Sequence, residues 1–116
     1  MRTYNILDRI PNTTPEYNER KQAACEWYTK LRFGVVSDDG VIPEQTVLAR
    51  CNGRSPADVL DLMAIELSML VFSDLRVVKT RYFWVVRDSH NQMVEWTENA
   101  GEAYQYILDR RVPRLL

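Results

Sequence analysis

The sequence has few of the residues from which catalytic and metal sites are built. Its 116 residues include one histidine, two cysteines and four glycines. His90 is therefore the only imidazole for a triad or a zinc site, and Cys25 and Cys51 belong to no C-x-x-C pair. The glycines are isolated from one another, which argues against a P-loop and a dinucleotide fingerprint. We expect no enzyme activity, no metal and no cofactor.

Long apolar runs and an excess of one charge are also missing. The most apolar stretch, 59–72, is interrupted by Asp61 and Glu66 and is too short to cross a bilayer, and residues 1–10 lack the apolar core of a signal peptide. The formal net charge is -1, so no overall field draws the chain to nucleic acid or to an anionic membrane. We expect a soluble, cytoplasmic protein that folds as a single domain over residues 1–116.

Three segments carry the start signals and the apolar spacing of helices. Thr14, Ser55 and Asn99 are N-cap candidates, and each precedes apolar residues that recur at three- and four-residue intervals. They predict helices over residues 15–31, 55–72 and 100–112, the last of which ends at Pro113.

The remaining segments resemble strands and hairpins. Residues 33–36 and 46–50 predict a first hairpin around the turn Asp38-Asp39-Gly40, with a short helix over 43–50 as the competing interpretation. Residues 75–87 predict one long strand that pairs with residues 93–96, which makes Trp84 and Trp96 candidate cross-strand neighbours. Residues 3–10 predict a short strand or an irregular arm.

These elements predict an α+β fold. We expect an antiparallel sheet of about four strands, built from two hairpins, with three helices mainly on one side. Residues 35–38 (VVSD) resemble residues 85–88 (VVRD), and each run is followed by a return strand, a capped start and an apolar helix. This similarity indicates either a β-β-α pseudo-repeat or independent use of the same hairpin signals.

Some residue pairs have the chemistry of a site but a simpler explanation. Asp38 and Asp39 have the composition of a turn, and Asp58 lies in the first turn of a predicted helix, where the helix dipole favours acids. Cys51 lies near Arg50 and Arg54, so it is a better candidate for a reactive thiol than Cys25, which falls on an apolar helix face. We interpret all of these as structural.

The most informative feature is that the helix over 55–72 is apolar on two sides. At about 100° per residue, one broad face contains Val59, Leu60, Met63, Leu67, Leu70 and Val71. The other side carries a row that we call the second stripe: Leu62, Ile65, Met69 and Phe72, bordered by Asp58 and Asp61. Large apolar patches are uncommon on soluble monomers, so the second stripe is covered either by the helix over 15–31 or by a partner.

We therefore expect a non-enzymatic protein-interaction module. It is interpreted as a small regulator or inhibitor, of the kind that phages and mobile elements encode as accessory proteins, and its partner is another protein or a second copy of itself. The second stripe forms the contact, and Asp58 and Asp61 form its polar rim. The alternative is a nucleic-acid-binding protein that uses a basic and aromatic strand face composed of Lys79, Arg81, Phe83 and Arg87.

Overall fold

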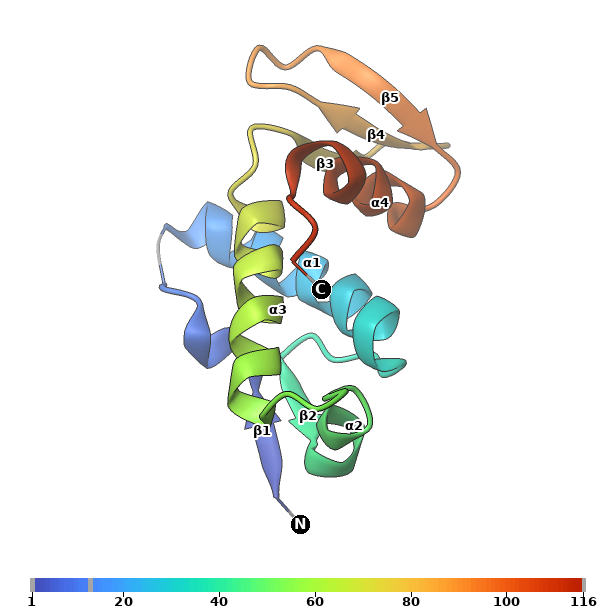
Figure 1. Ribbon diagram of the computed structural model, residues 1–116. Coiled ribbons are helices and arrows are strands. Elements are labelled where there is room, and N and C mark those ends of the chain that lie inside the picture. The colour runs from blue at the N-terminus through green and yellow to red at the C-terminus, as the bar shows by residue number, and fades with distance from the viewer. Residues whose placement is uncertain (1, 13, 116) are drawn as a thin grey trace.

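The computed structural model describes residues 2–12 and 14–115, which fold into α helices and two antiparallel sheets (Figure 1). The elements are β1 (Thr3–Asn5), the 3-10 helix η1 (Ile6–Arg9), α1 (Pro15–Phe33), β2 (Val41–Pro43), α2 (Glu44–Leu48), α3 (Pro56–Val71), β3 (Arg76–Lys79), β4 (Trp84–Arg87), β5 (Met93–Thr97) and α4 (Ala100–Arg111). The predicted α+β class is confirmed. The strands, however, form a pair and a separate three-stranded sheet rather than one sheet of about four strands.

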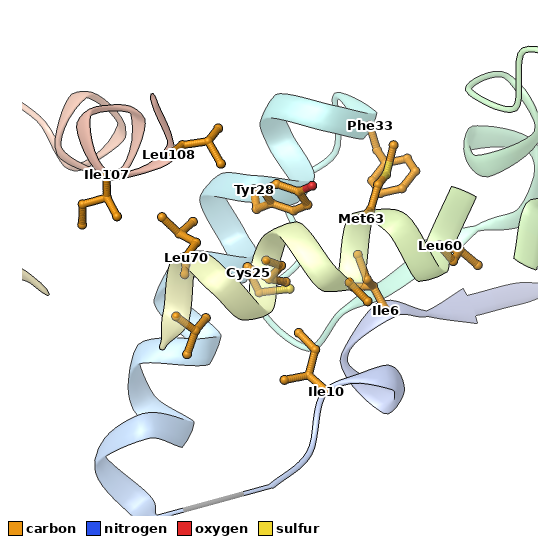
Figure 2. Packing of buried hydrophobic residues seen from close by; sticks show 14 of the residues in the cluster. Ile6, Ile10, Cys25, Tyr28, Phe33, Leu60, Met63, Leu70, Ile107 and Leu108 are labelled. Carbon is orange, nitrogen blue, oxygen red and sulfur yellow. The ribbon is translucent and has the colours of Figure 1, made fainter. Parts of the chain in front are cut away.

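The molecule is elongated, with extents of 43 × 26 × 25 Å. Helices α1 and α3 occupy its middle, the β1–β2 pair with α2 lies at one end, and the β3–β4–β5 sheet with α4 lies at the other (Figure 1). One cluster of buried side chains runs from Ile6 and Ile42 to Val86 and Ile107. Figure 2 shows its middle, where side chains of η1, α1 and α3 meet, and where Leu70 faces Leu108 of α4. No helix in the described part of the chain is long and apolar enough to cross a membrane.

The three predicted helices are present and start after Thr14, Ser55 and Asn99, but the Thr14 side chain makes no capping hydrogen bond to the described residues, whereas the other two do. The Ser55 hydroxyl accepts the Asp58 N–H at 3.1 Å, and the Asn99 side chain accepts the Glu102 N–H at 2.9 Å. The first helix, α1, is two residues longer than predicted because Gly34 is the residue that ends it. Gly34 has φ +74°, a left-handed conformation that glycine adopts without strain, and its N–H bonds to the Lys30 carbonyl.

The predicted first hairpin over residues 33–50 is wrong. Phe33 is the last residue of α1, residues 34–40 are a loop, and β2 pairs with β1 in the register Tyr4↔Ile42. Residues 44–48 form α2, which is the competing helical interpretation. The prediction paired two strands within residues 33–50, whereas the structure pairs β2 with β1 of the N-terminal arm. Because residues 33–50 form no hairpin, they do not repeat the β-β-α arrangement of β4, β5 and α4.

The close approach of β1 to the 37–40 loop depends on a glycine. The Gly40 carbonyl accepts the Ile6 N–H at 3.0 Å, and Gly40 has φ +82°. A Cβ atom at this position would lie 2.7 Å from both Asn5 Oδ1 and Leu7 Cγ. Gly40 is therefore required both for its conformation and for the space it leaves.

The single long strand predicted over residues 75–87 is also wrong. A turn at residues 80–83 divides it into β3 and β4, which pair back on each other in the register Val77↔Val86. The Thr80 backbone N–H and its hydroxyl both donate to the Phe83 carbonyl at 2.8 Å. Alternation of apolar residues is identical in one long strand and in two short antiparallel strands, so the pattern did not reveal the turn. This error exchanges the faces on which several side chains lie.

Candidate interaction surfaces

Helix α3 buries one side in the core and leaves the second stripe half exposed. The six residues of its broad face are all buried, as predicted. In the second stripe, Ile65, Met69 and Phe72 have 45%, 39% and 37% of their surface exposed, and Leu62 is of intermediate exposure. The second stripe is therefore neither enclosed within the chain nor fully open to solvent.

Two neighbouring elements cover part of the second stripe. The Tyr17 ring of α1 packs on Phe72, with 5.2 Å between ring centroids. Arg9 of η1 donates to Asp61 at 2.9 Å, which places an ion pair at the border of the stripe. Beside the Arg9–Asp61 ion pair lies an open groove of about 500 Å³, lined by Arg9, Asp61, Ala64, Ile65, Ser68 and Met69. Tyr17 of α1 thus covers the Phe72 end of the second stripe, and Asp58 is exposed in the first turn of α3 at the opposite end.

The predicted nucleic-acid surface of Lys79, Arg81, Phe83 and Arg87 does not form as one strand face. Lys79 pairs with Trp84 across the sheet, and its ammonium lies 5.6 Å from the centre of the Trp84 ring. Arg81 lies in the β3–β4 turn, with its guanidinium 5.3 Å from the centre of the Tyr82 ring. Because the chain reverses at residues 80–83, the regular alternation that placed these four residues together is interrupted.

The strand register defines a different surface, which we call the outer sheet face. Residues directly opposite each other share a side, so the pairs Val78↔Val85 and Val85↔Trp96 place these three residues together. The Phe83 and Trp96 rings pack edge-to-face, with 4.9 Å between their centroids, and the centroid of the Tyr82 ring lies 6.5 Å from that of Phe83. Trp96 is 51% exposed and Phe83 is 44% exposed.

The outer sheet face is separate from the main core. Val86 belongs to the core cluster, whereas its neighbour Val85 is buried without being part of that cluster. Trp84 packs on the core and is paired with Thr97, so Trp84 and Trp96 lie on opposite faces and are not the cross-strand pair that we expected. Sequence reasoning missed this surface because it expected Trp96 to lie beside Trp84 rather than on the opposite face of the sheet.

Two arginines lie on the outer sheet face at the end away from the aromatic rings. Arg76 and Arg87 are paired in the β3–β4 register, and their side chains donate to the side-chain and backbone oxygens of Asn91, respectively. Among the described residues, no carboxylate lies within 4.0 Å of any of the four cations of the β3–β4 hairpin: Arg76, Lys79, Arg81 and Arg87. The positive charge of this hairpin is therefore not neutralised locally.

A buried polar cluster joins α1 to α3. Glu66 is 1% exposed, accepts a hydrogen bond from the Tyr28 hydroxyl and pairs with Arg32 at 3.1 Å. Burial, and then the bond to Glu66, raise the pKa of Tyr28 above its ordinary value, so the phenol stays protonated. The sequence could have predicted this cluster, because helical spacing places Glu66 on the broad apolar face of α3, between Met63 and Leu70. A buried acid on such a face requires partners.

The residues considered for catalysis are not assembled into a site. His90 is exposed in the β4–β5 turn, and no hydrogen bond within residues 2–12 and 14–115 joins it to Cys25 or Cys51. Burial, with smaller contributions from Asp39 and Asp38, raises the pKa of the Cys25 thiol to about 12. The described residues contain no group of three or more histidine, cysteine, aspartate or glutamate side chains that could hold a metal ion.

Comparisons of this chain with protein-family models, with curated proteins and with solved structures found no match. Function is therefore inferred from the chemistry and geometry of the chain's own surfaces.

Proposed function

We propose that the protein is a non-enzymatic interaction module that regulates or inhibits a partner protein by binding it through the second stripe of α3. The observation that carries this proposal is the exposure of Ile65 and Met69 beside an open groove, on a helix whose other side is fully buried. Apolar side chains around a groove, bordered by polar groups, are typical of the centre of a protein interface.

The second stripe is held in place before any partner arrives. The inner side of α3 packs in the core, and Glu66 ties the helix to Tyr28 and Arg32 of α1. A contact surface on a rigid helix loses little conformational entropy on binding. Each of the three exposed apolar side chains is already more than half buried, so completing its burial contributes roughly 1 kcal/mol.

The border of the second stripe carries both signs of charge. Asp58 is exposed at one end, and the Arg9–Asp61 ion pair flanks the groove. This pattern supports a partner with an apolar patch and a polar rim rather than a strongly charged polymer. A second copy of the chain meets the same description, because a surface with both charges can be complementary to itself across a two-fold axis.

The proposal is tested with one disruptive substitution and one matched control. Ile65→Lys places a charge in the second stripe, whereas Leu48→Lys places it at an apolar residue of similar exposure on α2. A partner is first captured from source cells and purified, and its affinity for each variant is then measured by calorimetry. We expect at least about 10-fold weaker binding for Ile65→Lys, which corresponds to about 1.4 kcal/mol, and little change for Leu48→Lys.

Two results decide the outcome. Equal affinities for the two variants and the wild type contradict the proposal. Light scattering across a range of concentrations measures self-association, and a dimer that Ile65→Lys dissociates while Leu48→Lys does not identifies the partner as a second copy.

A further inference from the structure

We infer that the outer sheet face binds single-stranded nucleic acid, with bases stacked on Phe83 and Trp96 and phosphates held by the arginines around them. This inference does not rest on the proposed function, because it concerns a different surface. The sequence patterns placed only one aromatic ring on a basic strand face, whereas the structure brings three together.

Three exposed aromatic rings lie together at one end of the outer sheet face, each edge-to-face with the next. Phe83 and Trp96 contact each other at 4.9 Å, and Tyr82 extends the row at 6.5 Å from Phe83. Tyr82 is 74% exposed, and the other two rings keep roughly half of their surface open. Exposed rings on an open sheet are the element with which many proteins bind unpaired bases, and every base has a face that can stack.

The outer sheet face is open to a ligand. Helix α4 packs against β3, β4 and β5 (Figure 1). It lies on the core side of the sheet, because Val86 belongs to the core cluster and Val77 and Trp84 pack against that cluster. In Figure 1, no helix of the described chain covers the opposite side of this sheet. A base can therefore approach Trp96 without displacing part of the fold.

Cations stand at both ends of the outer sheet face. Arg76 and Arg87 lie at the β4–β5 turn, and Arg81 lies at the β3–β4 turn above the Tyr82 ring. Positions 83 and 87 are four residues apart, which is about 13 Å along a strand. Asn91, a neutral group, orients Arg76 and Arg87 without neutralising them, so both remain available to phosphates.

Charge favours nucleic acid over a protein as the ligand of this surface. Residues 76–97 contain four cations and two acids, within a chain of formal net charge -1. Both acids are occupied by backbone groups: Asp88 accepts the N–H groups of His90 and Gln92, and Glu95 accepts the N–H of Trp96. A duplex is disfavoured because its bases are already stacked on each other and do not expose their faces to the rings.

The test measures binding of fluorescein-labelled twelve-nucleotide strands, oligo-dT and oligo-U, by fluorescence anisotropy at low salt. We expect both single strands to bind more tightly than a duplex of equal length. Phe83→Leu keeps an apolar side chain but removes the ring, and we expect it to weaken binding at least about 10-fold. Arg81→Gln and Arg87→Gln are each expected to reduce the slope of log affinity against log salt by about 0.7.

Matched controls lie away from the outer sheet face. Arg54→Gln removes an exposed arginine of the loop before α3, and Leu48→Ser changes an exposed apolar residue of α2. Neither is expected to change affinity for the single strands. Thermal unfolding of each variant shows whether it is folded before its binding is measured.

Several results overturn the inference. These are an absence of binding to all oligonucleotides at low salt, equal binding of Phe83→Leu and the wild type, and equal loss of affinity in Arg54→Gln and Arg87→Gln. A chain that binds no nucleic acid but associates with a protein or with itself, and loses that association in Phe83→Leu, identifies the outer sheet face as a protein interface instead. Because Ile65→Lys tests only the second stripe, either proposal can fail while the other holds.

Discussion

Helix α3 and the β3–β4–β5 sheet are both apolar on two sides, yet the fold treats their second sides differently. Tyr17 and Arg9 close over the edges of the second stripe of α3, whereas no helix in Figure 1 covers the outer sheet face. The acid Asp61 at the border of the stripe is paired, and the arginines of the sheet have no carboxylate within 4.0 Å in the described chain. Surplus apolar surface is thus common to both, and the surrounding charge distinguishes them.

The comparison shows why exposure alone does not identify a ligand. The second stripe is an apolar row whose border carries both signs of charge, which supports a protein partner. The outer sheet face is an aromatic row beside cations with no carboxylate nearby, which supports an anionic ligand that contains flat rings. The inner sides of the two elements also differ: α3 contains the buried Glu66, whereas the inner side of the sheet places Val77, Trp84 and Val86 against the core and leaves the charged Lys79 exposed.

The largest effect is expected at the inner side of α3. Glu66→Ala removes the acceptor of the Tyr28 hydroxyl and the partner of Arg32, and we expect it to lower the free energy of unfolding by about 3 kcal/mol. This loss is at the lower end of the range expected when a buried ion pair is broken, because the Arg32 side chain is 28% exposed and its charge can be hydrated once Glu66 is gone. Urea unfolding followed by circular dichroism measures the change. Glu66→Gln, which keeps an acceptor, is the control, and a loss below about 1 kcal/mol in Glu66→Ala contradicts the prediction.

Substituting Trp84 and Trp96 compares how much each face of the sheet contributes to the free energy of unfolding. Trp84→Ala removes a ring packed on the core, and we expect a loss of about 3 kcal/mol in the free energy of unfolding. Trp96→Ala removes a ring that is 51% exposed, and we expect a loss of about 1 kcal/mol. Chemical denaturation of both variants under the same conditions gives the difference. Equal losses would show that the outer sheet face stabilises the fold as much as the inner one does.

The reaction rates of the two cysteine thiols measure how readily the core around α1 opens to solvent. Cys25 is fully buried in α1 and its pKa is raised to about 12, whereas Cys51 is only partly buried after α2. We expect Cys25 to react with an aromatic disulfide reagent about 100-fold more slowly than Cys51 in the native protein. The Cys51→Ser and Cys25→Ser variants separate the two rates by absorbance. Similar rates in the two variants would indicate that the core around α1 opens easily.

The smallest effect is expected in the loop between α1 and β2. The Val41 N–H and the Ser37 hydroxyl donate to Asp39 and lower its pKa below the usual value of 3.8. Because the folded pKa is the lower one, ionised Asp39 stabilises the fold above about pH 4, and this contribution is lost as pH falls through the folded value. Asp39→Asn is therefore expected to melt slightly below the wild type at pH 7. Melting curves at pH 7 and at about pH 2 are compared, and a difference that persists at the lower pH contradicts the prediction.

Local signals in the sequence located the helices well. Ser55 and Asn99 make the predicted capping bonds, and the broad face of α3 is buried as its spacing indicated. The strands were harder because strand pairing depends on distant partners: β2 pairs with the N-terminal arm, and Thr80 closes a turn that contains neither glycine nor proline. Of the candidate surfaces, the second stripe was visible in the spacing, whereas the outer sheet face depended on a register that the pattern did not reveal.

The sequence by itself determined the α+β class, the helix starts and the surplus of apolar surface on α3, because these follow from caps and periodicity within one segment. The tertiary structure alone decided which residues share a face of the sheet and which of them a neighbour covers. Trp96 illustrates the reason. The alternation of residues along β5 is the same whichever side of the sheet faces the core. Only the pairing of Val85 with Trp96 and the position of α4 determine that the Trp96 ring faces away from the core.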